Sequence, residues 1–145
     1  MIAPYDWIIQ SSLEKLTALG FSVLKDCAYL MNLQRGRFQL EISTERYYHP
    51  TLLTILHYDA DTENARKFHI ATIMKVIAPE RFELLRNAFD FTTAKGTQAA
   101  LEFQIEFLSD FESTVFQEPV IYFQLCEETE KEDLKRSGID IDKLS

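Results

Sequence analysis

Metal binding is the first chemistry that the spacing of the polar side chains suggests. Asp59, Asp61 and Glu63 place carboxylates at alternate positions of one segment, as the start of a calcium-binding loop does. Such a loop needs glycine at its sixth position and glutamate at its twelfth, where this chain has Asn64 and Ile70. We therefore expect no calcium site. The segment is interpreted as a solvated loop, with an acidic patch for a basic partner as the alternative.

The three histidines His49, His57 and His69 are the other candidates for metal ligands. His57 and His69 are expected on neighbouring strands, but no Cys, Asp or Glu lies at metal-site spacing from the histidines. The sequence therefore predicts no metal site, and we expect the histidines to make ordinary hydrogen bonds.

The chain also lacks the common signatures of catalysis and of nucleotide binding. Neither the GxSxG motif nor a catalytic signature around Cys27 or Cys126 occurs. The phosphate-binding patterns GxGxxG and GxxxxGK[ST] are absent as well. We expect no catalytic residue, no enzymatic activity and no cofactor. Both cysteines are expected to be inert core residues in a reducing compartment.

One polar and aromatic cluster interrupts the predicted strands, and it contains Arg46, Tyr47, Tyr48 and His49. Tyrosine and arginine are enriched in protein-recognition surfaces, because an aromatic ring gives contact area at low entropy cost and arginine makes forked hydrogen bonds. These four residues, together with Asp59, Asp61 and Glu63, are our predicted protein-binding residues. The alternative is that the tyrosines cover the edge of the core.

Composition limits the class of protein further. A chain of 145 residues with 46% hydrophobic residues fits a single domain with a substantial core. Its formal net charge of -8 disfavours nucleic-acid binding and favours basic partners. No apolar run approaches the ~20 residues of a membrane-spanning helix, and no signal peptide is evident, so we expect a cytoplasmic protein without membrane contact.

Hydrophobic periodicity predicts an α+β fold. An N-terminal helix over 4–19 is expected to end at Gly20, with Phe21 folding back on Leu16. An antiparallel meander of about four strands follows, and then C-terminal helices pack on one face of the sheet. We expect one α+β domain over residues 1–126 and a charged, frayed tail over residues 127–145.

The strands are predicted from the two-residue alternation of apolar side chains. Extended chain is expected over 21–33, with an interruption at Lys25 and Asp26, and a hairpin over 37–58. A further strand is expected over 67–71. The run 52–56 is apolar on both faces, which is typical of a strand that is covered on both sides or lies centrally.

The second half of the chain has helical spacing. Helices are expected over 70–77 and again from Pro79, because proline suits the first turn of a helix. After a loop over 92–96, Thr97 is expected to cap a helix over 98–116, which we prefer to a strand because the segment is long and contains no Gly or Pro. Segment 120–125 is a strand or a helix, with helix favoured.

The predicted helix over 98–116 has an unusually broad apolar arc. Such an arc is wider than a surface helix needs, so we expect another helix or a second subunit to cover it. This leaves a homodimer open. The arc contains Ala100, Leu101, Phe103, Ile105, Phe107, Leu108 and Phe111.

The order of helix, meander and helices, with the LxxLGF segment over 16–21 and the RYYHP segment over 46–50, resembles the small bacterial immunity proteins that neutralise a cognate toxin. The resemblance covers 5 to about 116. It implies a non-enzymatic inhibitor that binds its toxin tightly and presents an acidic surface to a basic nuclease. It assigns no individual residue.

Two other interpretations stay open. Type III secretion chaperones are also small, acidic α+β proteins, but they place a helix between sheet segments, which this chain is not expected to do. The third interpretation is a ligand-binding or hydrolytic domain with a pocket between sheet and helices, lined by Phe and Tyr. A protein-binding function remains our main expectation.

Overall fold

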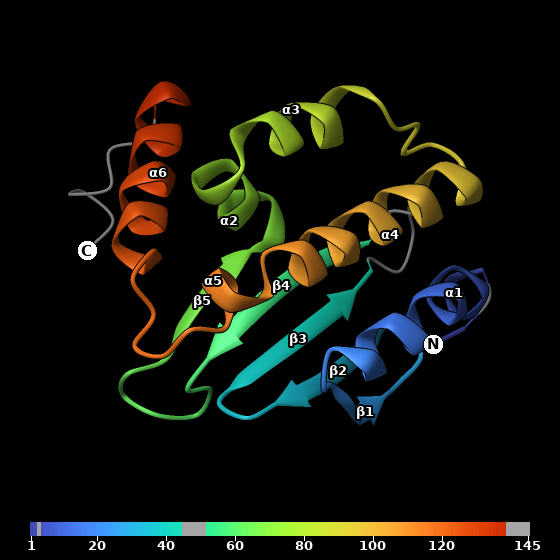
Figure 1. Cartoon of the computed structure of the whole chain (residues 1–145). Coiled ribbons are helices and arrows are strands. Elements are labelled where there is room, and N and C mark those ends of the chain that lie inside the picture. Colours follow the sequence, from blue (N-terminus) through green and yellow to red (C-terminus); the bar gives the residue numbers. More distant parts are fainter. Residues whose placement is uncertain (3, 45–51, 139–145) are drawn as a thin grey trace.

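The computed structural model describes residues 1–2, 4–44 and 52–138. In this part of the chain, the N-terminal helix α1 (Tyr5–Ala18) precedes all strands. The strands are β1 (Ser22–Asp26), β2 (Leu30–Arg35), β3 (Phe38–Ser43), β4 (Leu53–Tyr58) and β5 (Arg66–His69). The helices that follow are α2 (Ile70–Ile77), α3 (Pro79–Asn87), α4 (Ala94–Asp110), α5 (Glu112–Val115) and α6 (Phe123–Arg136). The predicted α+β fold is confirmed (Figure 1).

The sheet is an antiparallel meander in the order β1-β2-β3-β4-β5. It has five strands in the described residues, where about four were predicted, because segment 21–33 forms two paired strands. The register of β1 against β2 shifts between Val23 and Lys25, which marks a β-bulge. The expected interruption at Lys25 and Asp26 therefore corresponds to a bulge at Leu24 and a turn after Asp26.

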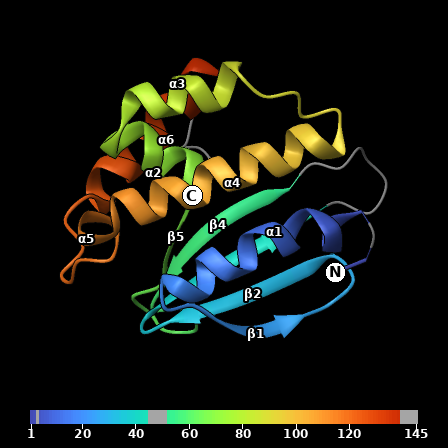
Figure 2. The ribbon, with the colours of Figure 1, turned by 45° about the vertical axis from the view of Figure 1, so that its right-hand side comes forward.

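One face of the sheet carries the core. Phe38, Leu40 and Ile42 in β3 are buried and alternate with less buried neighbours, as the two-residue period requires. Figure 2 shows α1 and α4 lying across this side of the sheet. The helices therefore cover one face, as predicted.

Strand β4 shows that one of the two predictions for the run over 52–56, a strand covered on both faces, is wrong. Leu53 is 46% exposed, so the apolar run over 52–56 is not covered on both faces. The strand instead lies centrally, between β3 and β5. Its apolar character on the second face consequently needs another explanation.

Helix α1 ends as its sequence predicts. Gly20 adopts a positive φ of 92°, its N–H donates to the Thr17 carbonyl, and the N–H of Phe21 donates to the Leu16 carbonyl at 3.0 Å. These two bonds form a Schellman cap, and both Leu16 and Phe21 are buried. The cap fixes the turn that leads from α1 into the sheet.

The broad apolar arc of α4 is covered within the chain. Leu101, Ile105 and Phe107 are at most 1% exposed, and α1 packs against α4. The rings of Phe89 and Phe103 also meet, with centroids 5.3 Å apart. Another helix therefore supplies the predicted cover, and the arc gives no reason to expect a second subunit.

Helix α6 differs from the expected frayed tail. Residues 127–136 continue the helix that begins at Phe123, and Glu127 and Asp133 form ion pairs with Arg66 and Lys75. Phe123 packs against Tyr58 and Phe68, and Cys126 is fully buried. Within 119–126, where strand and helix were both open, the chain turns through 119–122 and the helix begins at Phe123. None of the described helices has the length and apolar character needed to cross a bilayer.

The start of α4 also differs from the prediction. Thr93, not Thr97, is the N-cap, and its hydroxyl accepts a hydrogen bond from the N–H of Gly96 at 3.0 Å. The carbonyl of Asp90 comes so close that a Cβ atom at position 96 would lie 1.8 Å from its oxygen. Gly96 therefore allows the preceding loop to pack against the first turn of the helix.

Gly96→Ala is expected to destabilise the protein, although alanine is the better helix former. Helix propensity alone predicts a gain of about 1 kcal/mol, whereas the contact with Asp90 predicts a loss of roughly 1 to 3 kcal/mol in the free energy of unfolding. Urea denaturation measures the difference. Lys95→Ala, at an exposed position in the same turn, is the control and should change stability by less than about 0.5 kcal/mol. A stabilised G96A variant would contradict the described loop packing.

Candidate functional site

The second face of the sheet is left uncovered by the helices of the described chain, and we call it the open face. Strand register arranges its side chains in three cross-strand rows. The first row is Leu30, Ser43 and Leu53, the second is Asn32, Glu41, Ile55 and His69, and the third is Gln34, Gln39, His57 and Lys67. The rows run from aliphatic at the start of β4 to polar and charged at its end.

His57 and Glu41 form the central polar contact of the open face. They are diagonal neighbours, since Glu41 lies opposite Ile55 and His57 lies opposite Gln39. The Nε2 atom of His57 is 3.1 Å from Oε1 of Glu41, and the hydroxyl of Ser43 donates to the same carboxylate at 3.3 Å. The predicted role of His57 as an ordinary hydrogen-bonding residue is confirmed.

A polar pocket of about 460 Å³ lies at the charged end of the open face. Glu41, His57, Arg66 and Lys67 line it from the sheet, and Asp61 lines it from the β4–β5 connection. It combines both signs of charge and contains no deep apolar wall. Such a surface suits hydrogen bonds and ion pairs with another protein better than it suits a small apolar ligand.

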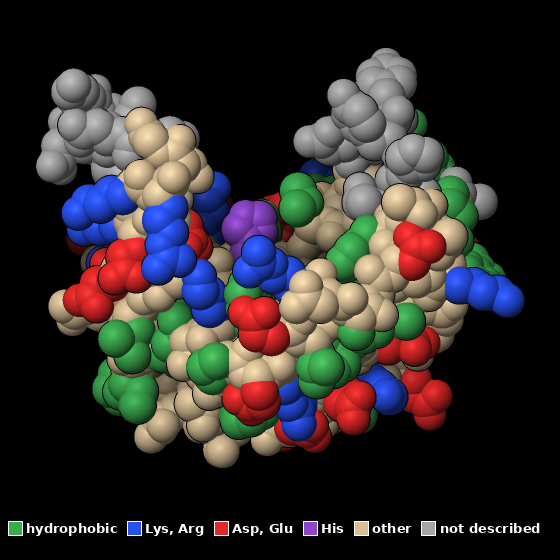
Figure 3. Space-filling view, turned by 90° about the horizontal axis from the view of Figure 1, so that it is seen from above, with side chains coloured by type: hydrophobic (Ala, Val, Ile, Leu, Met, Phe, Trp, Pro, Cys, Tyr) green, Lys and Arg blue, Asp and Glu red, His purple; other side chains and the backbone are tan. Residues whose placement is uncertain are grey.

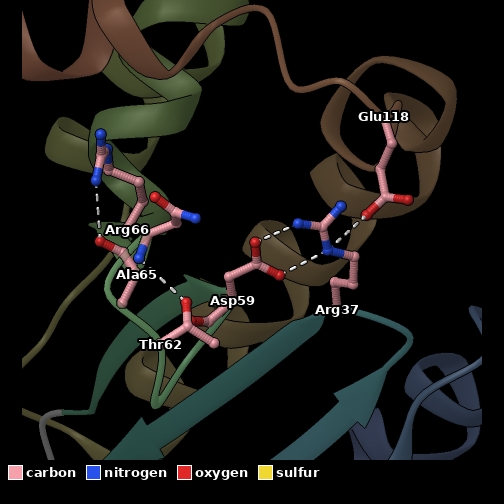
Figure 4. A network of polar contacts seen from close by, with 7 residues as sticks. Arg37, Asp59, Thr62, Ala65, Arg66 and Glu118 are labelled. Atoms are coloured by element: carbon pink, nitrogen blue, oxygen red, sulfur yellow. Dashed lines mark hydrogen bonds and ion pairs between the residues drawn. The ribbon is translucent and has the colours of Figure 1, made fainter.

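The β4–β5 connection contains the predicted acidic patch. Within this patch, Asp59 differs from Asp61 and Glu63 because it is paired with Arg37. The carboxylate of Asp59 accepts two hydrogen bonds from the Arg37 guanidinium, one of them from Nε at 2.6 Å, and Arg37 also lies 3.8 Å from Glu118 (Figure 4). Arg37 stacks over the ring of Tyr58, 4.7 Å from its centroid. The hydrogen bond from Arg37 lowers the pKa of Asp59 below its ordinary value.

The carboxylate of Asp59 is therefore already paired within the chain. Asp61 and Glu63 form the exposed part of the patch. The turn that holds them is well bonded, since Thr62 donates to the Asp59 carbonyl through both its N–H and its hydroxyl. Figure 4 shows this turn together with Arg66, which folds back to the Ala65 carbonyl. Asp59 and Asp61 adopt positive φ angles of 51° and 67°, a strained conformation for residues other than glycine.

The predicted residues Arg46, Tyr47, Tyr48 and His49 lie outside the described residues. The described chain stops at Thr44 and resumes at Leu52, at the opposite end of β4 from Asp59. A strand of this length spans roughly 17 Å. The open face lies between the two ends, and it is the surface that the sequence analysis missed; its signal was the second apolar side of the run over 52–56.

The structure brings no set of metal ligands together in the part of the chain that it describes. No cluster of three or more His, Cys, Asp and Glu side chains is placed to hold a metal ion among the described residues. Ser12 and Lys15 have the SxxK spacing of some serine hydrolases. Ser12 is fully buried in α1 and Lys15 is exposed, so this serine is not accessible to a substrate.

The two cysteines differ in accessibility. Cys126 is buried in α6 as predicted, and burial raises the pKa of its thiol to about 12. Cys27 is exposed in the β1–β2 connection, which corrects the expectation that it is a core residue. Its position in a tight connection between two strands leaves it outside the packed layers.

Iodoacetamide is expected to alkylate Cys27 but not Cys126 in the native protein at neutral pH, because alkylation requires an accessible thiolate. Mass spectrometry of the peptides measures the label at each cysteine. Unfolding in guanidinium chloride should expose both thiols, and Cys27→Ser should remove all labelling of the native protein. Equal labelling of both cysteines before unfolding would contradict the buried position of Cys126.

Arg37→Gln is expected to raise the pKa of Asp59 toward its ordinary value of about 3.9, since the charged donor is lost. Because the pKa is lowered in the folded state, the pair stabilises the protein above the ordinary Asp pKa, and this contribution is lost as the pH falls through the lowered value. Carboxyl ¹³C NMR titration measures the change. Asp90, whose pKa is lowered by hydrogen bonds from Thr92, is the control and should not respond. An unchanged Asp59 pKa would show that Arg37 is not the cause of the lowered value.

Comparison of the chain with protein-family models, curated proteins and solved structures found no match.

Proposed function

We propose that this chain is a non-enzymatic protein-binding protein that holds its partner on the open face and on the exposed carboxylates of the β4–β5 connection. The form of this function that we favour is inhibition of a basic toxin in the manner of an immunity protein. The aliphatic end of the open face is the observation that carries the proposal.

The open face is more apolar than a solvated sheet face requires. Antiparallel sheets that face water alternate apolar and polar residues, so the outer positions of β4 should be polar. Leu53 and Ile55 occupy two of these positions, and Leu53 is 46% exposed. Contact with a partner would bury these side chains beside the polar row of His57, which gives an apolar centre next to hydrogen-bonding groups.

Charge supports a basic partner. The chain has a net charge of -8, and many of its described basic side chains already bind carboxylates within the chain. These are Arg35 with Glu112, Arg37 with Asp59, Arg66 with Glu127, Lys75 with Asp133 and Arg81 with Asp110. Asp61 and Glu63 lie beside the open face without such a partner. Complementary charge would speed association and favour basic proteins over others.

The strand order also favours an immunity-type inhibitor over a secretion chaperone. All five described strands follow one another before α2 begins, with no helix between sheet segments. This arrangement is that expected from the resemblance to immunity proteins. The open, charged pocket at the end of β4 gives little support to a small apolar ligand at that place.

The open face alone is smaller than a usual interface. Four strands at ~4.8 Å spacing and six residues at ~3.3 Å rise give a face of roughly 400 Å², about half of the ~800 Å² that each partner buries in a standard complex. The contact must therefore extend beyond one end of β4. Asp61 and Glu63 supply such an extension at one end.

Leu53→Asp is expected to weaken binding of the product of the adjacent gene at least tenfold, because it puts a charge in the apolar part of the contact. The two proteins would be co-expressed and purified, and calorimetry would measure the dissociation constant of each variant. Wild-type binding should weaken as ionic strength rises, since complementary charges are screened by salt. Growth of cells that produce the adjacent product would report inhibition of a toxin.

Leu84→Asp is the matched control, since Leu84 is 52% exposed on α3, away from the open face. It should leave the dissociation constant unchanged. Equal binding by the L53D and L84D variants would remove the open face from the interface. A purified chain that binds no adjacent product but turns over a small molecule would refute the protein-binding function.

A further inference from the structure

A second, smaller pocket lies at the start of β4, where Leu53 and His69 of the open face meet Thr54 on the core face and residues of α2, α3 and α4. It has a volume of about 180 Å³. Leu53, Ala71, Leu85 and Phe91 form apolar walls, and they come from β4, α2, α3 and the loop before α4. Viewed from above, Figure 3 shows a surface hollow with a histidine, Lys and Arg side chains and hydrophobic side chains around it. The walls of this pocket differ clearly from the charged pocket at the other end of β4.

The base of the pocket is polar and buried. Thr54 and Gln104 line it and are only 7% and 8% exposed. The hydroxyl of Thr54 donates to Oε1 of Gln104, and Nε2 of Gln104 donates to the Ala100 carbonyl at 3.2 Å. This pair links the sheet to α4, and it brings a hydroxyl and a carboxamide to the bottom of an apolar pocket.

The hydrogen-bonding capacity of this pair is only partly used. A carboxamide has two N–H donors, and a hydroxyl can accept as well as donate. Within the described residues, the second N–H of Gln104 has no acceptor and the oxygen of Thr54 accepts no hydrogen bond. The pair therefore retains one unused donor and one unused acceptor, which is the complement of a hydroxyl group.

The size of the pocket fits one aromatic ring. A cavity of about 150 Å³ lined by Leu, Ile and Phe is large enough to bind benzene. The volume here is slightly larger, which leaves space for one oxygen beyond a six-membered ring. Apolar walls around the ring and polar groups at its far end together select a phenol.

We propose that this pocket receives a tyrosine side chain of the bound partner protein. The inference rests on the proposed function and deepens it, because Leu53 and His69 belong both to the pocket and to the rows of the open face. A partner that covers the open face and extends past the start of β4 therefore reaches the pocket. The anchor also extends the contact beyond the open face, and tyrosine is one of the residues that contribute most to protein interfaces.

The first experiment uses p-cresol, which has the side-chain structure of tyrosine, and toluene, which lacks the hydroxyl. NMR titration of the full chain would follow the side-chain NH₂ of Gln104 and the methyl groups of Leu53 and Leu85. We expect p-cresol to shift these signals and to bind more tightly than toluene. Gln104→Leu should reduce this preference roughly three- to tenfold, as loss of one neutral hydrogen bond does.

Gln98→Leu, on the same helix but outside the pocket, is the matched control and should keep the preference. Thr54→Val removes the hydroxyl with little change in shape and provides the same test if the Q104L variant does not fold. An equal affinity for p-cresol and toluene in the wild-type chain would refute a hydroxyl-binding base. Binding of p-cresol only after Tyr47 and Tyr48 are changed to alanine would assign the pocket to the chain's own tyrosines and would overturn the proposal.

The second experiment identifies the source of the phenol in the complex with the adjacent gene product. Each tyrosine of that protein would be changed to phenylalanine, and binding to the wild-type, Q104L and Q98L chains would be measured. We expect one Tyr→Phe variant to weaken binding to the wild-type and Q98L chains several-fold but to have no effect on binding to the Q104L chain.

This design separates the two proposals. A complex that depends on Leu53 but contains no tyrosine coupled to Gln104 would refute the tyrosine anchor and leave the protein-binding function in place. Binding of p-cresol that depends on Gln104, without any coupled tyrosine in the partner, would assign the pocket to a free phenol and would equally overturn the anchor. The absence of any complex would refute the protein-binding function itself.

Discussion

The two-residue period of the strands, applied to a sheet that is covered on one side, is the constraint on which the structure depends. Leu33, Leu40 and Leu56 enter the core because their side chains point toward α1 and α4, and the intervening residues must then face outward. A shift of one residue in any strand would bring these outward residues into the core and expose the leucines. The packing that stabilises the fold thus also fixes the order of the side chains on the open face.

Charge has a different role on the two sides of the molecule. The ion pairs of Arg66 with Glu127 and of Lys75 with Asp133 connect α6 to β5 and α2, yet exposed pairs of this kind contribute only about 0 to 1 kcal/mol each. Attachment of α6 depends mainly on Phe123, which packs between Tyr58 and Phe68. The ion pairs nevertheless use most of the arginines, so the charge that remains for other molecules is chiefly negative.

The sequence was sufficient to predict the fold class and the order of most helices and strands, because the signals for these are local. The cap at Gly20, the helix that starts at Pro79 and the alternation in β3 each depend on a few neighbouring residues. The bulge at Leu24 and the approach of Asp90 to Gly96 depend on contacts between separate segments, and they were not foreseen. The helical state of 127–136 was missed because its few anchoring side chains lie among many charges.

Prediction of the site was less complete. The carboxylates of the β4–β5 connection were predicted from their spacing, but the sequence pattern did not show that Asp59 forms an ion pair with Arg37. The open face was missed because the apolar run over 52–56 was interpreted as buried or central, and only the positions of the helices show which side is exposed. The pocket that has Thr54 and Gln104 at its base is lined by residues from β4, β5, α2, α3 and α4, so no local pattern reveals it.

The bulge in β1 has a consequence for how this molecule meets others. An edge strand with free backbone groups invites a strand from another chain to extend the sheet, and such growth is a route to aggregation. The shift between Val23 and Lys25 breaks the regular spacing of the backbone groups along that edge, and it places a lysine there. Growth of the sheet by addition of a strand to β1 is thereby discouraged.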